Sequence, residues 1–142
     1  MDLRVVKFFR HHYTWLRESN PPADGGQFIA TESVLAQLER ENSWTGVADG
    51  VPIACAGTIR QWPGRYMAWA YLGKNTAPHM VWITKQVIVQ LEKLKGRVEM
   101  TVRSDFPIGQ RWANMLGFEV ETPCLRAFGP QGEDHVGFVR IN

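Results

Sequence analysis

Residues 66–103, YMAWAYLGKNTAPHMVWITKQVIVQLEKLKGRVEMTVR, contain the pattern that decides the fold of this 142-residue chain. Apolar residues dominate Tyr66–Leu72, and apolar and polar residues alternate over Arg97–Arg103, so both stretches are predicted strands. Between them, apolar residues recur every three or four positions over Pro78–Lys95, which predicts a helix that Gly96 ends. Two strands joined through a helix of this length predict a right-handed parallel crossover.

The segment before this unit predicts an antiparallel meander. Trp44–Ala48 is a short apolar run, and Asp49-Gly50 is a typical hairpin turn. Pro52–Ile59 forms the next predicted strand, and Gln61–Gly64 turns the chain into Tyr66–Leu72. Three consecutive strands therefore precede the long helix.

The first forty residues contain weaker signals. Leu3–Phe9 is a predicted strand and His12–Arg17 a predicted short helix. The stretch Ser19–Gly26 is a loop by composition, because it contains two prolines and two glycines. A helix follows over Thr31–Arg40, with Thr31 as its N-cap.

The last third of the chain predicts one helix and one hairpin. Phe106–Leu116 forms the helix, which Gly117 ends. Cys124–Phe128 and Val136–Ile141 form the hairpin around a Gly129–Gly132 turn. The whole chain, 1–142, is therefore predicted to be one α+β domain with a mixed central β-sheet flanked by helices.

Composition narrows the class of protein. Sixteen Lys and Arg against fourteen Asp and Glu give a net charge of +2, too small to favour nucleic acid as a partner. Neither a secretory signal nor a membrane span is apparent, so we expect a cytoplasmic protein. Cys55 and Cys124 are predicted to be buried reduced thiols. No metal site is predicted, because the cysteines are far apart and His11-His12 has no third ligand.

Residues 111–119, RWANMLGFE, resemble the GNAT acetyltransferase superfamily, whose late helix ends in Leu-Gly-Phe before a strand. Val47–Gly57 is similar to the opening hairpin of that family. The resemblance covers residues 44–142. More narrowly, Gly73 with His79-Met80, and Arg111-Trp112 before the Leu-Gly-Phe, resemble small GNAT-like proteins encoded by bacteriophages, which would place this protein in the host cytoplasm.

The resemblance implies that acetyl-CoA is the co-substrate and that it binds where the fourth and fifth strands separate. Its pantetheine arm would pair with the end of the fourth strand. Its pyrophosphate would meet free N–H groups at the start of the next helix, where the helix dipole favours an anion. The implied cofactor-binding residues are Ala70, Tyr71, Leu72, Gly73, Lys74, Ala77, His79, Met80, Val81, Arg111 and Trp112.

The sequence also departs from the family pattern. The usual phosphate loop is Gln/Arg-x-x-Gly-x-Gly/Ala, whereas residues 74–79 are KNTAPH, without glycine and with a proline that lacks an N–H. The late helix of the family often has a tyrosine that protonates the departing thiolate. Here that position is Ala113, so the role is vacant.

Four residues are the candidate catalytic acids or bases: Ser104, Asp105, Glu99 and Tyr66. Two of them have an alternative or a condition. Asp105 could instead cap the next helix, and a catalytic Glu99 would need burial that raises its pKa.

Other polar residues near the implied site have two interpretations each. His79 could donate to phosphate or act as an acid, or it could be an exposed histidine. Trp112 and Arg111 could pack on the cofactor, although Trp112 could equally belong to the core. Glu133 and His135 are predicted surface residues.

The leading hypothesis is therefore an acetyl-CoA-dependent N-acetyltransferase that acts on an amine of a small molecule or a protein. The alternative is a non-catalytic GNAT-fold phage protein of the virion or of a host interaction. A nucleic-acid-binding adaptor is a third hypothesis, which the small net charge disfavours. Phe128 and Phe138 in the final hairpin, together with open sheet edges, suggest a homodimer.

Overall fold

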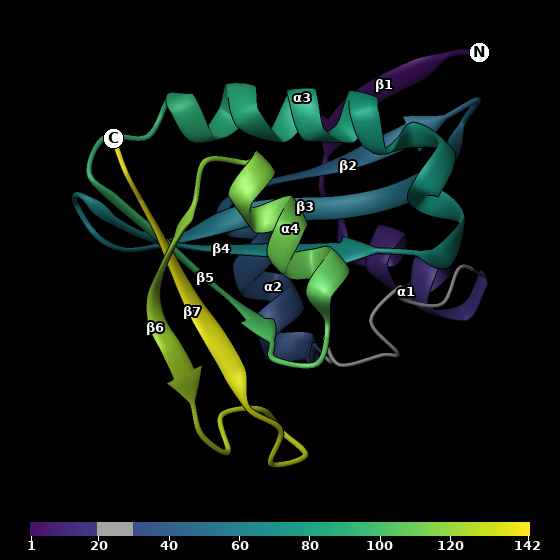
Figure 1. Cartoon of the computed structure of the whole chain (residues 1–142). Helices are drawn as coiled ribbons and strands as arrows, with labels where there is room; N and C mark the ends of the chain where they lie inside the picture. Colours follow the sequence, from purple (N-terminus) through teal and green to yellow (C-terminus); the bar gives the residue numbers. More distant parts are fainter. Residues whose placement is uncertain (20–29) are drawn as a thin grey trace. The chain divides into compact units, whose positions relative to one another are not determined.

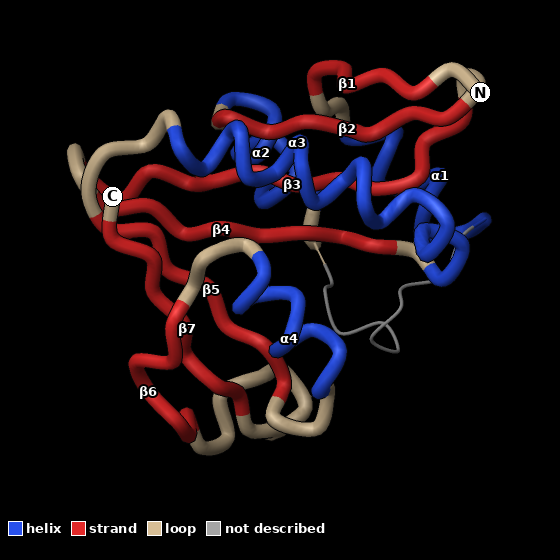
Figure 2. Tube along the Cα trace, turned by 45° about the horizontal axis from the view of Figure 1, so that its top comes forward, coloured by secondary structure: helices blue, strands red, loops and turns tan. Residues whose placement is uncertain are grey.

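The computed structural model describes residues 1–19 and 30–142, so the predicted loop after Ser19 lies outside the described residues (Figures 1 and 2). Its elements in chain order are β1 (Leu3–Lys7), α1 (Arg10–Ser19), α2 (Glu32–Arg40), β2 (Asn42–Ala48), β3 (Val51–Trp62), β4 (Arg65–Leu72), the 3-10 helix η1 (Lys74–His79), α3 (Met80–Glu92), β5 (Arg97–Arg103), α4 (Pro107–Met115), β6 (Glu119–Leu125) and β7 (His135–Ile141).

The strands form one seven-stranded sheet in the order β1-β2-β3-β4-β5-β7-β6. The β4–β5 pair is parallel, whereas β1–β2, β2–β3, β5–β7 and β6–β7 are antiparallel. This confirms the mixed sheet, the crossover through α3 and the C-terminal hairpin. The chain divides into two compact units, which we describe separately: unit 1 is 1–59 with 68–83, and unit 2 is 60–67 with 84–142.

The core of unit 1 forms where the apolar faces of α1 and α2 meet aromatic and sulfur-containing residues of the strands. Thr31 accepts a hydrogen bond from the N–H of Val34 and so caps α2, as predicted. The buried residues of this core are Phe8, Tyr13, Leu16, Leu35, Leu38, Cys55 and Tyr71.

Three side chains of unit 1, those of His12, Thr45 and Cys55, are linked by successive hydrogen bonds. The Nδ1 atom of His12 lies 3.1 Å from the N–H of Phe9 and 2.8 Å from the Oγ1 of Thr45, which is itself 3.5 Å from the Sγ of Cys55. Because a backbone N–H can only donate, Nδ1 must accept, which favours the neutral imidazole. Burial, and then the neighbouring His11, lower the pKa of His12. Burial raises the pKa of the Cys55 thiol to about 12, so this thiol stays protonated.

In unit 2, two turns meet at a pair of glycines. The N–H of Arg97 donates to the carbonyl of Gly64 at 2.8 Å, which starts the parallel pairing of β4 with β5. Gly96 has a φ of +114°, and a Cβ there would collide with the carbonyl oxygen of Gly64. Only glycine fits both the backbone angle and this close approach.

The Leu-Gly-Phe segment of unit 2 is a helix cap. The N–H of Gly117 donates to Asn114 and that of Phe118 to Ala113, both at 3.0 Å, and Gly117 has a φ of +92°. This is the Schellman arrangement, in which a left-handed glycine satisfies the last carbonyls of a helix. Leu116 and Phe118 are both buried beside it, which explains the apolar residues around the glycine.

Several predictions about individual elements are wrong. Pro78 lies inside η1 rather than at the first position of α3, which begins at Met80. β3 continues to Trp62, through part of the predicted turn. β6 starts at Glu119 and ends at Leu125, because Leu125 rather than Phe128 is the last residue paired with β7.

Predicted burial is also wrong at some side chains. Cys124 is exposed rather than buried, and Phe138 is buried, so only Phe128 of the two predicted dimer residues is exposed. Glu133 and His135 are half-buried and contact each other. The homodimer stays a prediction.

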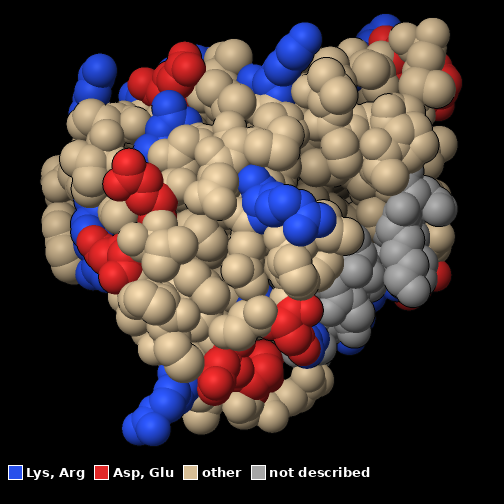
Figure 3. Space-filling view, in the orientation of Figure 1, with Lys and Arg blue, Asp and Glu red and all other residues tan. Residues whose placement is uncertain are grey.

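The charged side chains match the small net charge. On the face drawn in Figure 3, acidic and basic residues are interspersed and form no continuous basic patch. The described residues contain no group of three His, Cys, Asp or Glu side chains that could hold a metal ion. None of the helices in the described part of the chain has the length and hydropathy to cross a membrane.

The glycine contact in unit 2 generates a prediction about stability. We expect Gly132→Ala, whose site is open and has a φ of +78°, to lower the free energy of unfolding by about 1–2 kcal/mol. Gly96→Ala should lower the free energy of unfolding by about 1–3 kcal/mol more than Gly132→Ala does, because its Cβ also meets the Gly64 backbone. Urea unfolding measures both values. Equal losses would contradict the steric role of Gly96.

The surroundings of His12 predict a pH dependence. Since folding lowers the pKa of His12, this residue's contribution to stability is complete above the unfolded value of about 6.5 and falls as the pH decreases below it. We therefore expect the free energy of unfolding to decrease between pH 7.5 and pH 5.5 by more in the parent than in His12→Gln. An identical decrease in both proteins would show that His12 is not the group responsible.

Candidate functional site

In unit 1, the end of β4 passes directly into a helical segment. Tyr71 is buried at 2 % exposure, and Gly73 is buried with an extended backbone (φ −77°, ψ 163°). η1 and then α3 follow without a break. The predicted cofactor-binding residues between Ala70 and Val81 therefore lie on one continuous strand-to-helix connection.

Thr76 anchors this connection to the sheet. Its side chain is 2 % exposed, and its Oγ1 donates to the carbonyl of Ile53 in β3 at 3.0 Å. Its N–H donates to the carbonyl of Gly73 at 3.1 Å, which closes the first turn of η1. Sequence reasoning missed this role, because a threonine in a polar stretch has no pattern that marks it as buried.

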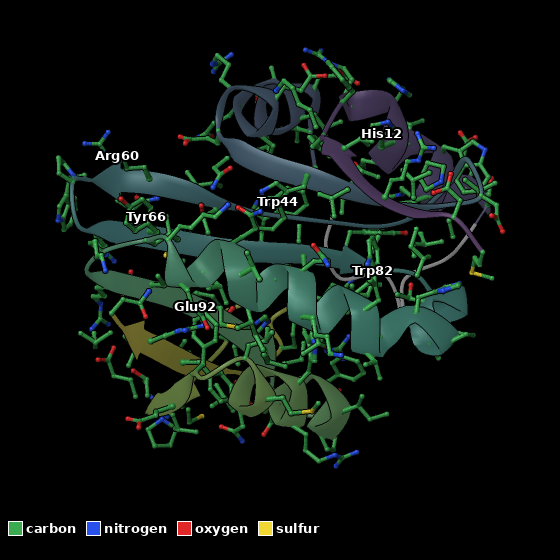
Figure 4. All side chains as sticks on the ribbon, turned by 90° about the horizontal axis from the view of Figure 1, so that it is seen from above. His12, Trp44, Arg60, Tyr66, Trp82 and Glu92 are labelled. Carbon is green, nitrogen blue, oxygen red and sulfur yellow. The ribbon has the colours of Figure 1, made fainter. Side chains whose placement is uncertain are left out.

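Trp82 fixes the beginning of α3. A Cβ at Gly46 of β2 would lie 3.3 Å from the indole ring of Trp82, so the missing side chain lets this ring approach the strand. Figure 4 labels Trp82 on α3. Neither Gly46 nor Trp82 was predicted as part of the site.

The N–H donors at this connection differ from the predicted set. The N–H of Met80 donates to the carbonyl of Ala77, and the N–H of Thr76 is used within η1. Met80 is therefore not the free donor that the sequence suggested, because η1 occupies the place where α3 was predicted to start. The first N–H groups of a helical segment have no partner within it, and here they belong to Lys74 and Asn75.

The parallel ladder between β4 and β5 is short. It consists of three pairs, Arg65 with Arg97, Tyr66 with Val98 and Met67 with Glu99, and the described residues show none beyond Met67. These three pairs lie in unit 2, whereas the rest of β4, 68–72, belongs to unit 1. β5 itself pairs with β7 along its whole length.

Glu99 and Tyr66 lie in this ladder in unit 2. Glu99 accepts hydrogen bonds from Arg65 at 2.6 Å and pairs with Arg97 at 3.0 Å. The Arg65 hydrogen bond, followed by Arg97, lowers the pKa of Glu99. A catalytic carboxylic acid requires a raised pKa, so this environment is opposite to the one that the predicted role needs. Tyr66 is half-buried, and Figure 4 labels it.

Ser104 and Asp105 are exposed where β5 ends. The side chain of Asp105 binds Arg103 at 2.7 Å, which lowers the pKa of Asp105. The N-cap of α4 is Phe106 and has no side-chain hydrogen bond, so the alternative in which Asp105 caps α4 is wrong. The N–H of Ser104 donates to the carbonyl of Asp134. Their catalytic roles stay predictions.

For α4, the structure supports a role in core packing more than a contact with the cofactor. Trp112 is 9 % exposed, and its indole N–H donates to the Oγ1 of Thr84 at 2.9 Å, as expected of a core tryptophan. Arg111 is exposed. Ala113, where the family often has a tyrosine, is fully buried and supplies no proton donor. A cofactor contact of Trp112 or Arg111 stays a prediction.

The anchor at Thr76 generates a prediction. We expect the isosteric Thr76→Val to lower the free energy of unfolding by about 1–3 kcal/mol, because it leaves the carbonyl of Ile53 without its donor. The control is Thr14→Val, which removes an exposed hydroxyl bound to Arg10 and should change stability little. Equal effects in urea unfolding would show that the buried hydrogen bond is not an anchor.

Comparison with known proteins gives matches in structure but not in sequence. No protein-family model matches the chain, and no curated protein matches it. A structure of Ard1 from Thermoplasma volcanium superposes with a TM-score of 0.77 at 12% identity, covering 99% of this chain and 98% of that one.

Two further structures are similar. The ribosomal-protein-S18-alanine N-acetyltransferase from Escherichia coli has a TM-score of 0.75 at 17% identity, covering 98% of this chain and 93% of that one. A structure of yncA from Salmonella typhimurium with its cofactor acetyl-CoA has a TM-score of 0.70 at 12% identity, with the same two coverages of 98% and 93%. The likeness includes the first forty residues, which the sequence matched weakly. The chain therefore has the fold of GNAT-family acetyltransferases.

Proposed function

We propose that this protein is an acetyl-CoA-dependent N-acetyltransferase. The observation that carries the proposal is the connection in unit 1 where β4 ends at Leu72 and η1 begins at Lys74, with Thr76 bound to Ile53. The resemblance to the GNAT superfamily implies that a pantetheine arm would pair like a strand with the backbone of Ala70, Tyr71 and Leu72. The fold and the structural neighbour solved with acetyl-CoA support the same ligand.

The pyrophosphate of acetyl-CoA would meet the start of η1. The N–H groups of Lys74 and Asn75 have no partner within the helical segment, and the helix dipole adds partial positive charge there. Thr76, which follows these donors, is tied to Ile53, and such an anchor lowers the entropic cost of ordering the loop on binding. This location replaces the one around Met80.

The chemistry is a direct transfer. The nitrogen lone pair of the acceptor amine attacks the thioester carbonyl carbon, and the carbon–sulfur bond breaks. The proton that the amine loses passes to the departing sulfur, so coenzyme A leaves as a thiol. The N–H of Leu72 or of a neighbour would polarise the carbonyl oxygen as negative charge develops on it. The structural neighbours include enzymes named for spermidine and for an alanine of a ribosomal protein, so both small amines and proteins are candidate acceptors. We also propose a cytoplasmic location, as expected from the sequence.

Specific observations favour the non-catalytic alternative as the second candidate. Ala113 is buried where a proton donor is common, and Glu99 is held in ion pairs. The phage resemblance belongs with this candidate. Calorimetric titration with acetyl-CoA separates the two candidates. If no heat of binding is detected at millimolar acetyl-CoA, the transferase is excluded and the non-catalytic function is left.

The proposed phosphate site predicts the effect of one isosteric charge. We expect Asn75→Asp to weaken acetyl-CoA binding about tenfold, because repulsion of about 1.4 kcal/mol acts on the phosphates. The same carboxylate at the start of a helical segment should not destabilise the free protein. Calorimetry measures the affinity, and urea unfolding measures the stability.

The matched control is Asn114→Asp, which makes the same change at an exposed position of α4. Its affinity for acetyl-CoA should equal that of the parent. If Asn75→Asp also binds as tightly as the parent, the phosphates do not lie at the start of η1.

A further inference from the structure

Three polar side chains of unit 2 form a hydrogen-bonded line that the proposed transferase chemistry does not use. The Oγ1 of Thr101 in β5 lies 3.0 Å from the Nδ1 of His135, the first residue of β7. The Nε2 of the same ring lies 3.4 Å from the Oε1 of Glu133. A hydroxyl, an imidazole and a carboxylate therefore follow one another in the order found in nucleophilic hydrolases.

The carboxylate decides the direction of these hydrogen bonds. The side chain of Glu133 is 13% exposed, and backbone N–H groups, among them that of Gln131 at 3.0 Å, and His135 together hold its pKa below the usual value against the opposing effect of burial. An ionised carboxylate can only accept, so the Nε2 of His135 carries the proton and Nδ1 has the lone pair. The Thr101 hydroxyl must then donate to Nδ1.

The loop before β7 is built around the Glu133 carboxylate. The N–H groups of Phe128 and Gly129 both donate to the carbonyl of Glu133 at 3.0 Å. A Cβ on Gly129 would collide with the carboxylate itself, so only glycine leaves room for Glu133 there. The loop therefore sets the carboxylate, and through it the ring of His135.

The Thr101 oxygen has lone pairs to spare. Within the described residues, His135 is the one hydrogen-bond partner of this hydroxyl, and the side chain is half-buried rather than enclosed. A threonine that only tied the loop to β5 would not need a carboxylate behind the imidazole. A hydroxyl that donates its proton to an oriented base is the arrangement of an activated nucleophile.

We propose that Thr101, His135 and Glu133 form an acyl-accepting site in which Thr101 takes an acyl group from an activated ester or thioester. The Thr101 oxygen attacks the carbonyl carbon, its proton passes to the Nδ1 of His135, and the alcohol or thiol leaves with that proton. Water then attacks the acyl-threonine through the same base, which releases the carboxylic acid and restores the hydroxyl. Thr101 and His135 are the catalytic residues, and Glu133 is a positioning residue. This inference is independent of the proposed acetyl transfer to an amine.

p-Nitrophenyl acetate is the probe. The protein is mixed with it, quenched in acid and digested with trypsin, and the peptide 98–103, VEMTVR, has Thr101 as its only hydroxyl. We expect this peptide to gain the mass of one acetyl group in the parent and in Thr101→Ser, but not in Thr101→Val. His135→Gln should slow the labelling at least about 100-fold, the usual size of a general-base contribution.

The loop offers a matched pair for Glu133. We expect Gly129→Ala to slow labelling about tenfold or more, because it displaces the orienting carboxylate. Gln131→Ala, in the same loop, removes an exposed side chain but keeps the N–H that binds the Glu133 carboxylate, so it should label like the parent. Circular dichroism checks that each variant is folded. If Thr101→Val does not fold, labelling of the serine in Thr101→Ser still tests whether a hydroxyl at this position accepts the acetyl group.

Acetyl on other peptides but not on 98–103 would overturn the proposal, as would an unchanged labelling rate in His135→Gln. Acetyl-CoA affinity, measured on the same preparations, separates the two proposals. A parent protein that binds acetyl-CoA but gives no acetyl-threonine loses only the acyl-accepting site, whereas labelling without acetyl-CoA binding contradicts only the transferase.

Discussion

The parallel pairing of β4 with β5 begins at the contact between Gly64 and Gly96 and ends three residues later at Met67 and Glu99. The start is rigid, because the N–H of Arg97 binds the carbonyl of Gly64 and Glu99 binds Arg65. β4 itself continues to Leu72, and η1 begins at Lys74. Everything that we propose about acetyl-CoA depends on this passage from strand to helix.

The charges and hydrogen bonds of the remaining polar groups show which of them stabilise the fold and which could bind or react. Glu99 and Asp105 are each held by arginines that lower their pKa, so they stabilise the fold as ionised carboxylates. Trp112 donates its N–H to Thr84 inside the core. Other groups carry the two proposals: the backbone N–H groups at the start of η1, and the hydroxyl of Thr101 with His135 and Glu133 behind it.

The sequence predicted the elements whose local signals agree with their packing. Thr31, Gly117 and the apolar stripe of α3 are such cases, because capping and periodicity act within one helix. The sequence did not predict features that depend on contacts with residues far along the chain. Thr76 is buried through Ile53 of another strand, and Glu133 and His135 are half-buried because a loop folds back over them. η1 escaped prediction because a proline suits both a 3-10 turn and the first turn of an α-helix.

Backbone amide NMR of the ¹⁵N-labelled protein, titrated with acetyl-CoA, tests the central claim most directly. The account predicts saturable shifts that are largest for the N–H groups of 70–76, among them those of Lys74 and Asn75, which would face the pyrophosphate. Shifts concentrated elsewhere in the chain, or none at millimolar acetyl-CoA, would contradict it.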